Sequence, residues 1–320
     1  AIFAQGGLAF VPSSFGRLIL WRRLADCLGT EVPKQAGRGA WESKGPAGVG
    51  MVFDFDDLPD APEDPKGAGT AAAAAAAAAA PVPAPLGRRM RVLALHGGGS
   101  NANIMRFQVQ TLRRMLGDRA EWSFLNGGRD WKFNQGQEPG DMMKGLADGQ
   151  PFKGWYGVKY DDDSDKPYNE KLFDLSVKFT YEEVEVGVDR VMKHMQDEGP
   201  FDVLLGFSQG CIVSHLIAAI LRQRGEVVPW RISVLFNGMR VRDNRYNELF
   251  EKPLSVPAVM VFGRQDEFYD YGRKSQAALY EDPVVLEHDE GHRFPSKQPR
   301  AKEIYEEVTV QILRHCGVSS

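Results

Sequence analysis

The chain has 320 residues, of which 43% are hydrophobic, so it is long enough for one large α/β domain with an appendage or for two small domains. A formal charge of -4, with lysines and arginines scattered along the sequence, excludes the basic surface that nucleic-acid-binding proteins need. Three widely spaced cysteines predict neither a disulfide framework nor a zinc site, and no apolar stretch reaches the roughly 20 residues that span a bilayer, so we expect a soluble protein.

Residues 1–88 are predicted to be a low-complexity extension. Glycine, proline and alanine dominate from about residue 34 to residue 90, and alanine occupies every position from 71 to 80. Such a segment buries too little apolar surface to offset the entropy that is lost when it becomes ordered. We therefore expect this part to be mostly disordered, with one short helix around residues 18–27.

The start of the extension bears on the compartment of the protein. No acidic residue precedes Asp26, while Arg17, Arg22 and Arg23 stand among apolar residues. This composition is compatible with an organelle transit segment, and a disordered or fragmentary leader explains it equally well. We expect a cytoplasmic protein, with nuclear presence also open, or a plastid or mitochondrial protein if the segment is a transit peptide.

Residues 89–318 are predicted to form an α/β domain. Six short apolar runs are separated by turn signals, and they lie at 92–95, 122–125, 203–205, 232–236, 258–262 and 284–286. A final helix is indicated by the spacing of Ile304, Tyr305, Val308, Ile312 and Leu313. Strands that alternate with helices predict a mainly parallel sheet covered on both faces, with functional loops at the carboxyl ends of the strands.

A further helix is expected before the run at 203–205. Thr180 followed by Glu183 matches a capping box, which predicts that the helix begins there. Its apolar face would comprise Tyr181, Val184, Val188, Val191, Met192 and Met195.

Residues 127–179 interrupt the alternation of strands and helices. Among glycines and aspartates this segment holds Trp131, Phe133, Phe152, Trp155, Tyr156 and Phe173. Long loops in compact domains tend to be functional or disordered. The segment is therefore either an aromatic cap over the functional site or an ordinary insertion packed on the surface.

The chemistry is indicated by Gly206-Phe207-Ser208-Gln209-Gly210, a G-x-S-x-G pentapeptide. It follows the apolar run at 203–205 and precedes a helical pattern formed by Cys211, Ile212, Leu216, Ala219 and Ile220. Glycines two positions before and after a serine allow a sharp strand-to-helix turn that exposes the hydroxyl as a nucleophile. We therefore predict that Ser208 is the nucleophile.

A serine nucleophile needs a histidine base and a carboxylate that orients it. His292 follows Gly291 in a loop after the run at 284–286 and is the predicted base, with His288 as the rival. The order of serine, acid and histidine in hydrolases calls for an acid after the run at 258–262, which favours Asp266. Glu267 and Asp270 are the alternatives to Asp266.

The oxyanion of an acyl-transfer intermediate needs backbone N–H donors. The Gln209 amide, at the start of the predicted helix, is the first candidate. The second is expected in His96-Gly97-Gly98-Gly99, where we favour the Gly98 amide with Gly99 as the alternative. A phosphate-binding loop is the weaker interpretation of these glycines, because neither a P-loop lysine nor G-x-G-x-x-G spacing accompanies them.

Four blocks in chain order resemble the FSH family of serine hydrolases, a group in the α/β-hydrolase superfamily that includes ovarian cancer-associated 2 esterases. They are 93–101, 205–210, Gly263-Arg264-Gln265-Asp266 and Gly291-His292-Arg293-Phe294-Pro295. The resemblance covers about residues 91–316 and implies an α/β-hydrolase fold. It also implies hydrolysis of carboxylic esters or thioesters, the triad Ser208, Asp266 and His292, and neither a metal nor a dissociable cofactor.

The sequence departs from the family pattern in two loops. Asp289 and Glu290 stand where a glycine usually pairs with Gly291, and Glu267-Phe268-Tyr269 is bulky. These differences concern the substrate pocket, for which Trp131, Trp155, Phe268 and Tyr269 are candidate lining residues that would favour a medium or long apolar acyl chain.

Two alternatives to an FSH-type esterase stay open. One is an enzyme like the acyl-protein thioesterases, which share the Gly-Phe-Ser-Gln-Gly sequence. The other is a hydrolase-fold protein that binds a small apolar ligand or a partner without catalysis. The expected partner in the enzymatic interpretation is a small acyl ester or thioester, and the sequence does not determine the oligomeric state.

Overall fold

A computed structural model describes residues 86–133, 138–161, 171, 174 and 176–318 of the chain. The expected extension at 1–88, including the short helix at 18–27, lies almost entirely outside these residues. The largest element of the described part is a six-stranded parallel sheet with the strand order β10-β9-β8-β7-β1-β2. Its strands are β1 (Met90–Leu95), β2 (Ala120–Leu125), β7 (Val203–Phe207), β8 (Ile232–Phe236), β9 (Ala258–Gly263) and β10 (Val284–His288).

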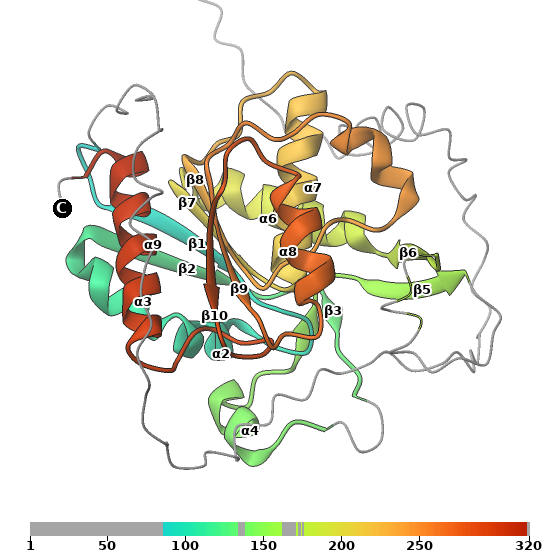
Figure 1. The fold of residues 1–320 in the computed structure, drawn as a ribbon, viewed down its shortest axis with the longest axis horizontal. Coiled ribbons are helices and arrows are strands. Elements are labelled where there is room, and N and C mark those ends of the chain that lie inside the picture. Colours follow the sequence, from blue (N-terminus) through green and yellow to red (C-terminus); the bar gives the residue numbers. More distant parts are fainter. Residues whose placement is uncertain (1–85, 134–137, 162–170, 172–173, 175, 319–320) are drawn as a thin grey trace, which may run out of the picture. The chain divides into compact units, whose positions relative to one another are not determined.

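Each of the six apolar runs therefore forms a strand, and the predicted α/β fold class is confirmed. Helices cover both faces, with α3 and α9 on one side of the sheet and α6, α7 and α8 on the other (Figure 1). The helices are α2 (Ala102–Gln108), α3 (Gln110–Leu116), α4 (Asp141–Ala147), α6 (Val184–Glu198), α7 (Gln209–Gln223), α8 (Tyr269–Ala277) and α9 (Arg300–Cys316). Short 3-10 turns are η1 (Gly117–Arg119) and η2 (Asn244–Phe250).

The core follows the two-residue period of the strands. Alternate residues of the strands, such as Val203 and Leu205 in β7, pack with Ile304, Val308 and Ile312 of α9 in one buried cluster. Nearly all of α7 is buried, because this helix lies between the sheet and its neighbours. The strand ends that carry the predicted site are therefore held in a rigid, dry scaffold.

The segment at 127–179 forms two small antiparallel sheets in its described part. One pairs β3 (Arg129–Asp130) with β4 (Lys153–Gly154), and the other pairs β5 (Gly157–Asp161) with β6 (Lys178–Glu182). The predicted capping box at Thr180 is wrong, because Thr180 pairs with Lys159 inside β6. Helix α6 begins only at Val184, and its N-cap residue Glu183 makes no side-chain capping bond.

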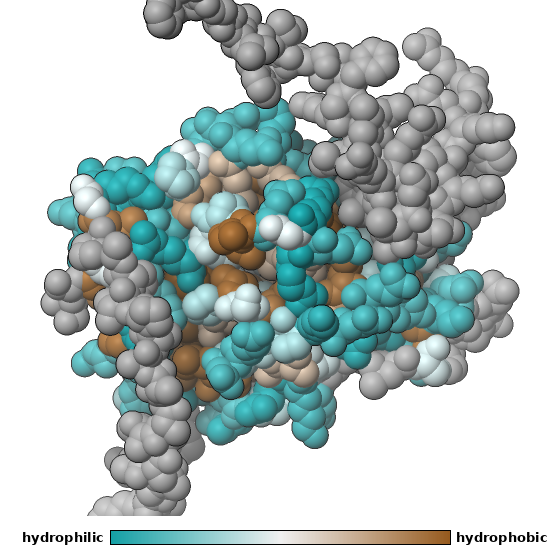
Figure 2. Space-filling view, turned by 90° about the horizontal axis from the view of Figure 1, so that it is seen from above, coloured by the Kyte–Doolittle hydropathy of each residue, from teal (hydrophilic) through white to brown (hydrophobic). Residues whose placement is uncertain are grey.

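One face of the molecule can be followed in Figure 2. In Figure 2 hydrophobic residues stand in several small patches between hydrophilic ones. The exposed large hydrophobic side chains come from different parts of the fold, and they are Phe107, Met142, Val186, Val227 and Val310. Within the same residues, no helix is both long and apolar enough to cross a lipid bilayer.

Candidate active site

Ser208 occupies a sharp turn between β7 and α7. It has φ 49° and ψ -113°, a conformation that non-glycine residues seldom adopt and that surrounding structure must enforce. A Cβ atom on Gly206 would lie 2.9 Å from the Cys211 backbone nitrogen. A Cβ atom on Gly210 would lie 2.4 Å from the Leu95 carbonyl oxygen. Backbone packing therefore requires glycine at both positions of the pentapeptide. The strand β7, the turn at Ser208 and the helix α7 follow one another as the motif predicts.

The glycine loop after β1 lies directly against this turn. A Cβ atom on Gly97 would be 3.3 Å from the Ser208 Cβ, and one on Gly98 would be 2.9 Å from the Gln209 Cδ. Gln209 is the first residue of α7, so its backbone N–H has no partner within the helix. The structure thus brings Ser208, Gln209 and Gly98 together, and the role of the two amides as oxyanion donors stays a prediction.

His96 fixes the start of the glycine loop, a role that the sequence did not reveal. The ring is fully buried, and burial lowers the pKa of His96 to about 4, so the imidazole is neutral near pH 7. The Gly127 backbone N–H donates to Nε2 at 2.9 Å, so the ring proton lies on Nδ1. Nδ1 donates to the Gly97 carbonyl oxygen at 2.6 Å. His96 therefore connects the glycine loop to the start of the insertion.

The Asp266 and His292 side chains are in contact, and their roles as orienting acid and base stay a prediction. His292 Nδ1 lies 2.7 Å from Asp266 Oδ2, and the two side chains are 8% and 3% exposed. The other carboxylate oxygen, Oδ1, accepts the Phe268 backbone N–H at 2.9 Å. Because the His292 ring packs against Phe207 at 5.2 Å and Phe268 at 5.3 Å between centroids, it lies beside the residue that precedes Ser208.

The alternative acids and the rival base occupy different environments. Glu267 and Asp270 are exposed, whereas Asp266 is 7% exposed. His288 is 2% exposed, and burial lowers its pKa. Its nearest acidic neighbour is Glu290, at 3.7 Å. The geometry therefore favours Asp266 and His292 over these alternatives.

Glu290 explains one departure from the family pattern. Its carboxylate is 4% exposed and accepts the backbone N–H groups of Ser296 at 2.7 Å and Lys297 at 3.0 Å. Burial opposes ionisation, but the hydrogen bonds from Ser296 and Lys297 outweigh it and lower the pKa of Glu290. Asp289, the other departure in this loop, pairs with Arg264 at the surface. Glu290 therefore stabilises the loop that carries His292, whereas Asp289 is a surface residue.

The four aromatic residues suggested for the pocket lie in unlike places. Trp131 is half-buried, and its indole packs directly against Gly98 and Gly99. A Cβ atom added to these glycines would lie 2.9 and 3.0 Å from the ring. Trp155 is 1% exposed and donates its indole N–H to the His96 carbonyl at 2.7 Å. Phe268 is 2% exposed beneath His292, and the Tyr269 hydroxyl donates to Glu287 at 3.0 Å. Only Trp131 combines partial exposure with contact to the glycine loop.

The inner part of the insertion is attached to the same turn. Ser100 and Lys153 exchange two backbone hydrogen bonds, at 2.7 and 3.2 Å. The Gln209 side chain accepts the Trp155 backbone N–H at 3.1 Å and donates to the Tyr156 carbonyl at 3.4 Å. These contacts place strand β4 and the residues after it beside the predicted nucleophile.

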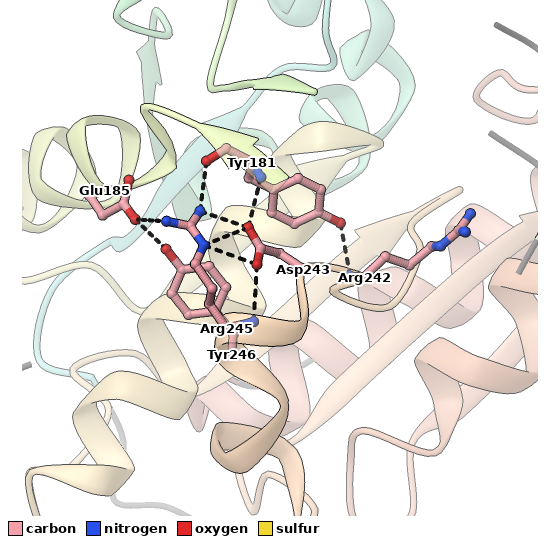
Figure 3. A network of polar contacts seen from close by, with 6 residues as sticks. All are labelled: Tyr181, Glu185, Arg242, Asp243, Arg245 and Tyr246. Carbon is pink, nitrogen blue, oxygen red and sulfur yellow. Dashed lines mark hydrogen bonds and ion pairs between the residues drawn. The ribbon is translucent and has the colours of Figure 1, made fainter. Parts of the chain in front are cut away.

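A polar network centred on the buried Asp243 holds β6, the strand at which the insertion ends (Figure 3). Asp243 is 1% exposed and accepts the Tyr181 backbone N–H at 2.7 Å and the Arg245 guanidinium at 2.7 Å. Arg245 also donates to the Tyr181 carbonyl at 2.9 Å and pairs with Glu185 at 3.4 Å. The Tyr246 hydroxyl donates to the same glutamate. The network therefore joins β6 and α6 to the segment that follows β8.

Replacing Asp243 with alanine should lower the free energy of unfolding by about 2 kcal/mol, because the buried Tyr181 backbone N–H and the half-buried Arg245 guanidinium lose their acceptor. Urea unfolding of the purified variant measures this change. Asp197→Ala serves as the control, because Asp197 pairs with Lys193 at the surface and should change stability by less than about 0.5 kcal/mol. Equal stabilities for Asp243→Ala and the unaltered protein would show that the network does not hold the insertion.

The described part of the chain contains no cluster of three or more His, Cys, Asp or Glu side chains that could hold a metal ion. Cys211 and Cys316 are buried free thiols, and burial raises the pKa of Cys211 and of Cys316, the latter to about 12. These two thiols are therefore unsuited to nucleophilic chemistry.

Comparison with known proteins links these residues to one family. A model of the family described as Serine hydrolase (FSH1) matches residues 86–304, which include every loop of the site. Esterase OVCA2 of Xenopus tropicalis is 26% identical over 223 residues, covering 68% of this chain and 92% of that protein. Hydrolase phiM of a fungal species is 26% identical over 244 residues, covering 71% and 99%. The crystal structure of esterase PE8 is 15% identical with a TM-score of 0.48, covering 71% and 93%.

Proposed function

This chain belongs to the serine hydrolase (FSH1) family, and from that premise we propose that it cleaves carboxylic esters or thioesters through an acyl-enzyme on Ser208. The observation that carries the proposal is the hydrogen bond of 2.7 Å between His292 and Asp266. The imidazole in this pair packs against Phe207, the neighbour of Ser208. A nucleophile, a base and an orienting acid thus come from three strand ends of one sheet.

Acylation begins when His292 Nε2 takes the proton of the Ser208 hydroxyl while the oxygen attacks the substrate carbonyl carbon. Asp266 accepts a hydrogen bond from the Nδ1–H group of His292, which fixes the tautomer and stabilises the imidazolium. The backbone N–H groups of Gln209 and Gly98 hold the oxyanion of the tetrahedral intermediate. The intermediate collapses, the carbon to leaving-group bond breaks, and the imidazolium protonates the departing alkoxide or thiolate.

Deacylation repeats these steps with water. His292 takes a proton from the water molecule, whose oxygen attacks the acyl carbon, and the imidazolium returns the proton to the Ser208 oxygen as the free acid leaves. The same machinery serves oxygen and sulfur leaving groups, so it does not separate an esterase from an enzyme like the acyl-protein thioesterases. We also propose that residues 89–318 form the hydrolase domain and that residues 1–88 are an extension. The insertion at 127–179 would form the cap of this domain.

Matched substrates test the proposal. Purified protein is given oxoesters and thioesters of the same acyl chains, from acetyl to decanoyl, and release of the alcohol or thiol is followed. We expect turnover of at least one series well above the uncatalysed rate, and the ratio between the two series identifies the preferred leaving atom. Folded protein that hydrolyses neither series would favour a binding protein without catalysis.

Trp131→Ala should lower kcat/KM for decanoyl esters by about 10-fold and change the acetyl ester by less than about 3-fold. The half-buried indole lies beside Gly98 and Gly99, where we expect it to contact an acyl chain. Losing that contact should cost on the order of 1–2 kcal/mol for a long chain. Phe107→Ala is the control, because Phe107 is a 53% exposed aromatic side chain on α2. An unchanged chain-length profile in Trp131→Ala would remove this residue from the pocket.

A further inference from the structure

Asn237 is a buried polar residue directly after β8, and no sequence motif includes it. It is 1% exposed and has φ 45°, a left-handed conformation that asparagine tolerates better than most side chains. The next residue is packed tightly, because a Cβ atom on Gly238 would lie 2.6 Å from the Cys211 Cβ. The turn is therefore fixed in place by α7.

This turn contacts all three segments that carry the proposed triad. The Phe236 carbonyl accepts the Ser208 backbone N–H at 3.1 Å, and the Asn237 backbone N–H donates to Val261 of β9 at 2.8 Å. The Asn237 side-chain Nδ2 donates to the Gly291 carbonyl at 3.1 Å. Phe236 and Asn237 together thus connect the nucleophile turn, the strand that leads to Asp266 and the loop of His292.

The accepting carbonyl belongs to the turn with His292 at its centre. The Arg293 backbone N–H donates to the same Gly291 oxygen at 2.7 Å, which closes a three-residue turn. A Cβ atom on Gly263 would lie 2.4 Å from that oxygen, so β9 approaches it closely on another side. The position of the His292 backbone therefore depends on what holds the Gly291 carbonyl, and Asn237 is the side chain that does so.

The side-chain oxygen of Asn237 indicates that this residue is not kept for stability alone. Oδ1 is buried and has no hydrogen-bond partner among the described residues. A buried acceptor without a partner destabilises the folded state and offsets much of what the bond from Nδ2 contributes. Removing the whole side chain should therefore change folding little, while the Gly291 carbonyl loses its connection to β8.

We propose that Asn237 is a positioning residue that holds His292 in register with Ser208, an inference that rests on the proposed function. The site places the base and the nucleophile on different loops, and a displacement of about 1 Å between reacting groups costs on the order of 100-fold in rate. The hydrogen bond from the Asn237 side chain to the Gly291 carbonyl links the loop of His292 to the end of β8, and β8 pairs with β7, the strand that leads to Ser208.

Two variants separate position from stability. Asn237→Gly keeps the left-handed backbone accessible and removes the donor, and Asn237→Asp keeps the shape but turns an oxygen toward the Gly291 carbonyl. We expect kcat for the preferred ester to fall on the order of 10- to 100-fold in both, with KM within about 3-fold. The unfolding midpoint should stay within a few degrees in Asn237→Gly and fall further in Asn237→Asp, whose carboxyl group would be buried without a donor. Asp282→Gly is the matched control, because Asp282 is exposed and has φ 44°, and it should keep full activity.

One further readout distinguishes this proposal from others. The low-field NMR signal of the His292 Nδ1 proton should shift in both variants, and this signal needs no activity. If the unaltered protein turns over no ester or thioester, the proposed function fails while the NMR shift still tests the position of His292. Unaltered kcat and an unmoved proton signal in Asn237→Gly, or loss of folding in both variants, would overturn the proposal.

Discussion

Replacing Ser208 with alanine should reduce ester hydrolysis by about 10⁶-fold, the loss expected when the nucleophile of a serine hydrolase is removed. Folding should be nearly unchanged, because the substitution deletes one oxygen at a position whose backbone conformation is set by its neighbours. Initial rates on p-nitrophenyl acyl esters and thermal unfolding measure the two quantities.

A serine on the helix that follows Ser208 provides the control for that experiment. Ser214 is fully buried in α7 and donates its hydroxyl to the Gly210 carbonyl at 2.8 Å, so Ser214→Ala perturbs the helix without touching the proposed chemistry. We expect Ser214→Ala to keep most of the activity. Substantial turnover by Ser208→Ala would mean that another group performs the hydrolysis.

Asp266→Asn should lower kcat by about 10⁴-fold while the structure of the loop is kept. The asparagine oxygen can still accept the Phe268 backbone N–H, as Asp266 Oδ1 does at 2.9 Å. Its NH₂ group would then face His292 Nδ1, which is 2.7 Å from the carboxylate in the unaltered protein. A donor at that place forces the ring proton onto Nε2, where the imidazole cannot accept the proton of Ser208.

The neighbouring acid gives the comparison for Asp266. Glu267 is exposed, so Glu267→Gln should change kcat by less than about 3-fold. A larger loss of kcat in Glu267→Gln than in Asp266→Asn would mean that Glu267, and not Asp266, orients His292. Steady-state kinetics of both variants at the optimal pH of the unaltered protein decide between them.

The sheet and the loops of the site could be predicted from the sequence because they depend on short-range patterns. Each apolar run was followed by a turn signal, and parallel strands place their carboxyl ends on one edge of a sheet. This geometry is enough to bring residues near 208, 266 and 292 together without any knowledge of their contacts. The pairing of His292 with Asp266 at 2.7 Å accords with that expectation.

The elements that the sequence did not reveal depend on contacts between distant segments. Thr180 and Glu183 matched a capping box, yet Thr180 became part of β6 because pairing with β5 satisfies its backbone. A strand ladder supplies partners for a whole segment, whereas a cap supplies them for one or two groups. The long-range pairing therefore overrode the local signal.

Buried polar side chains are the other part that sequence patterns did not predict. His96 and Glu290 look like loop residues in the sequence, and their positions became clear only from the backbone groups they contact, such as Gly127 and Ser296. Trp155 and Phe268 were candidates for the pocket because aromatic residues often line pockets. In the structure both are less than 3% exposed, since each fills the interior beside a histidine.

The site of covalent attachment is the most direct test of the proposed mechanism. Folded protein is treated with a fluorophosphonate, digested, and the modified residue is located by mass spectrometry. We expect one phosphonyl group on Ser208, much slower labelling in Asp266→Asn and none in denatured protein. Folded, unaltered protein that stays unlabelled at Ser208, or that carries the group on another residue, would contradict the mechanism.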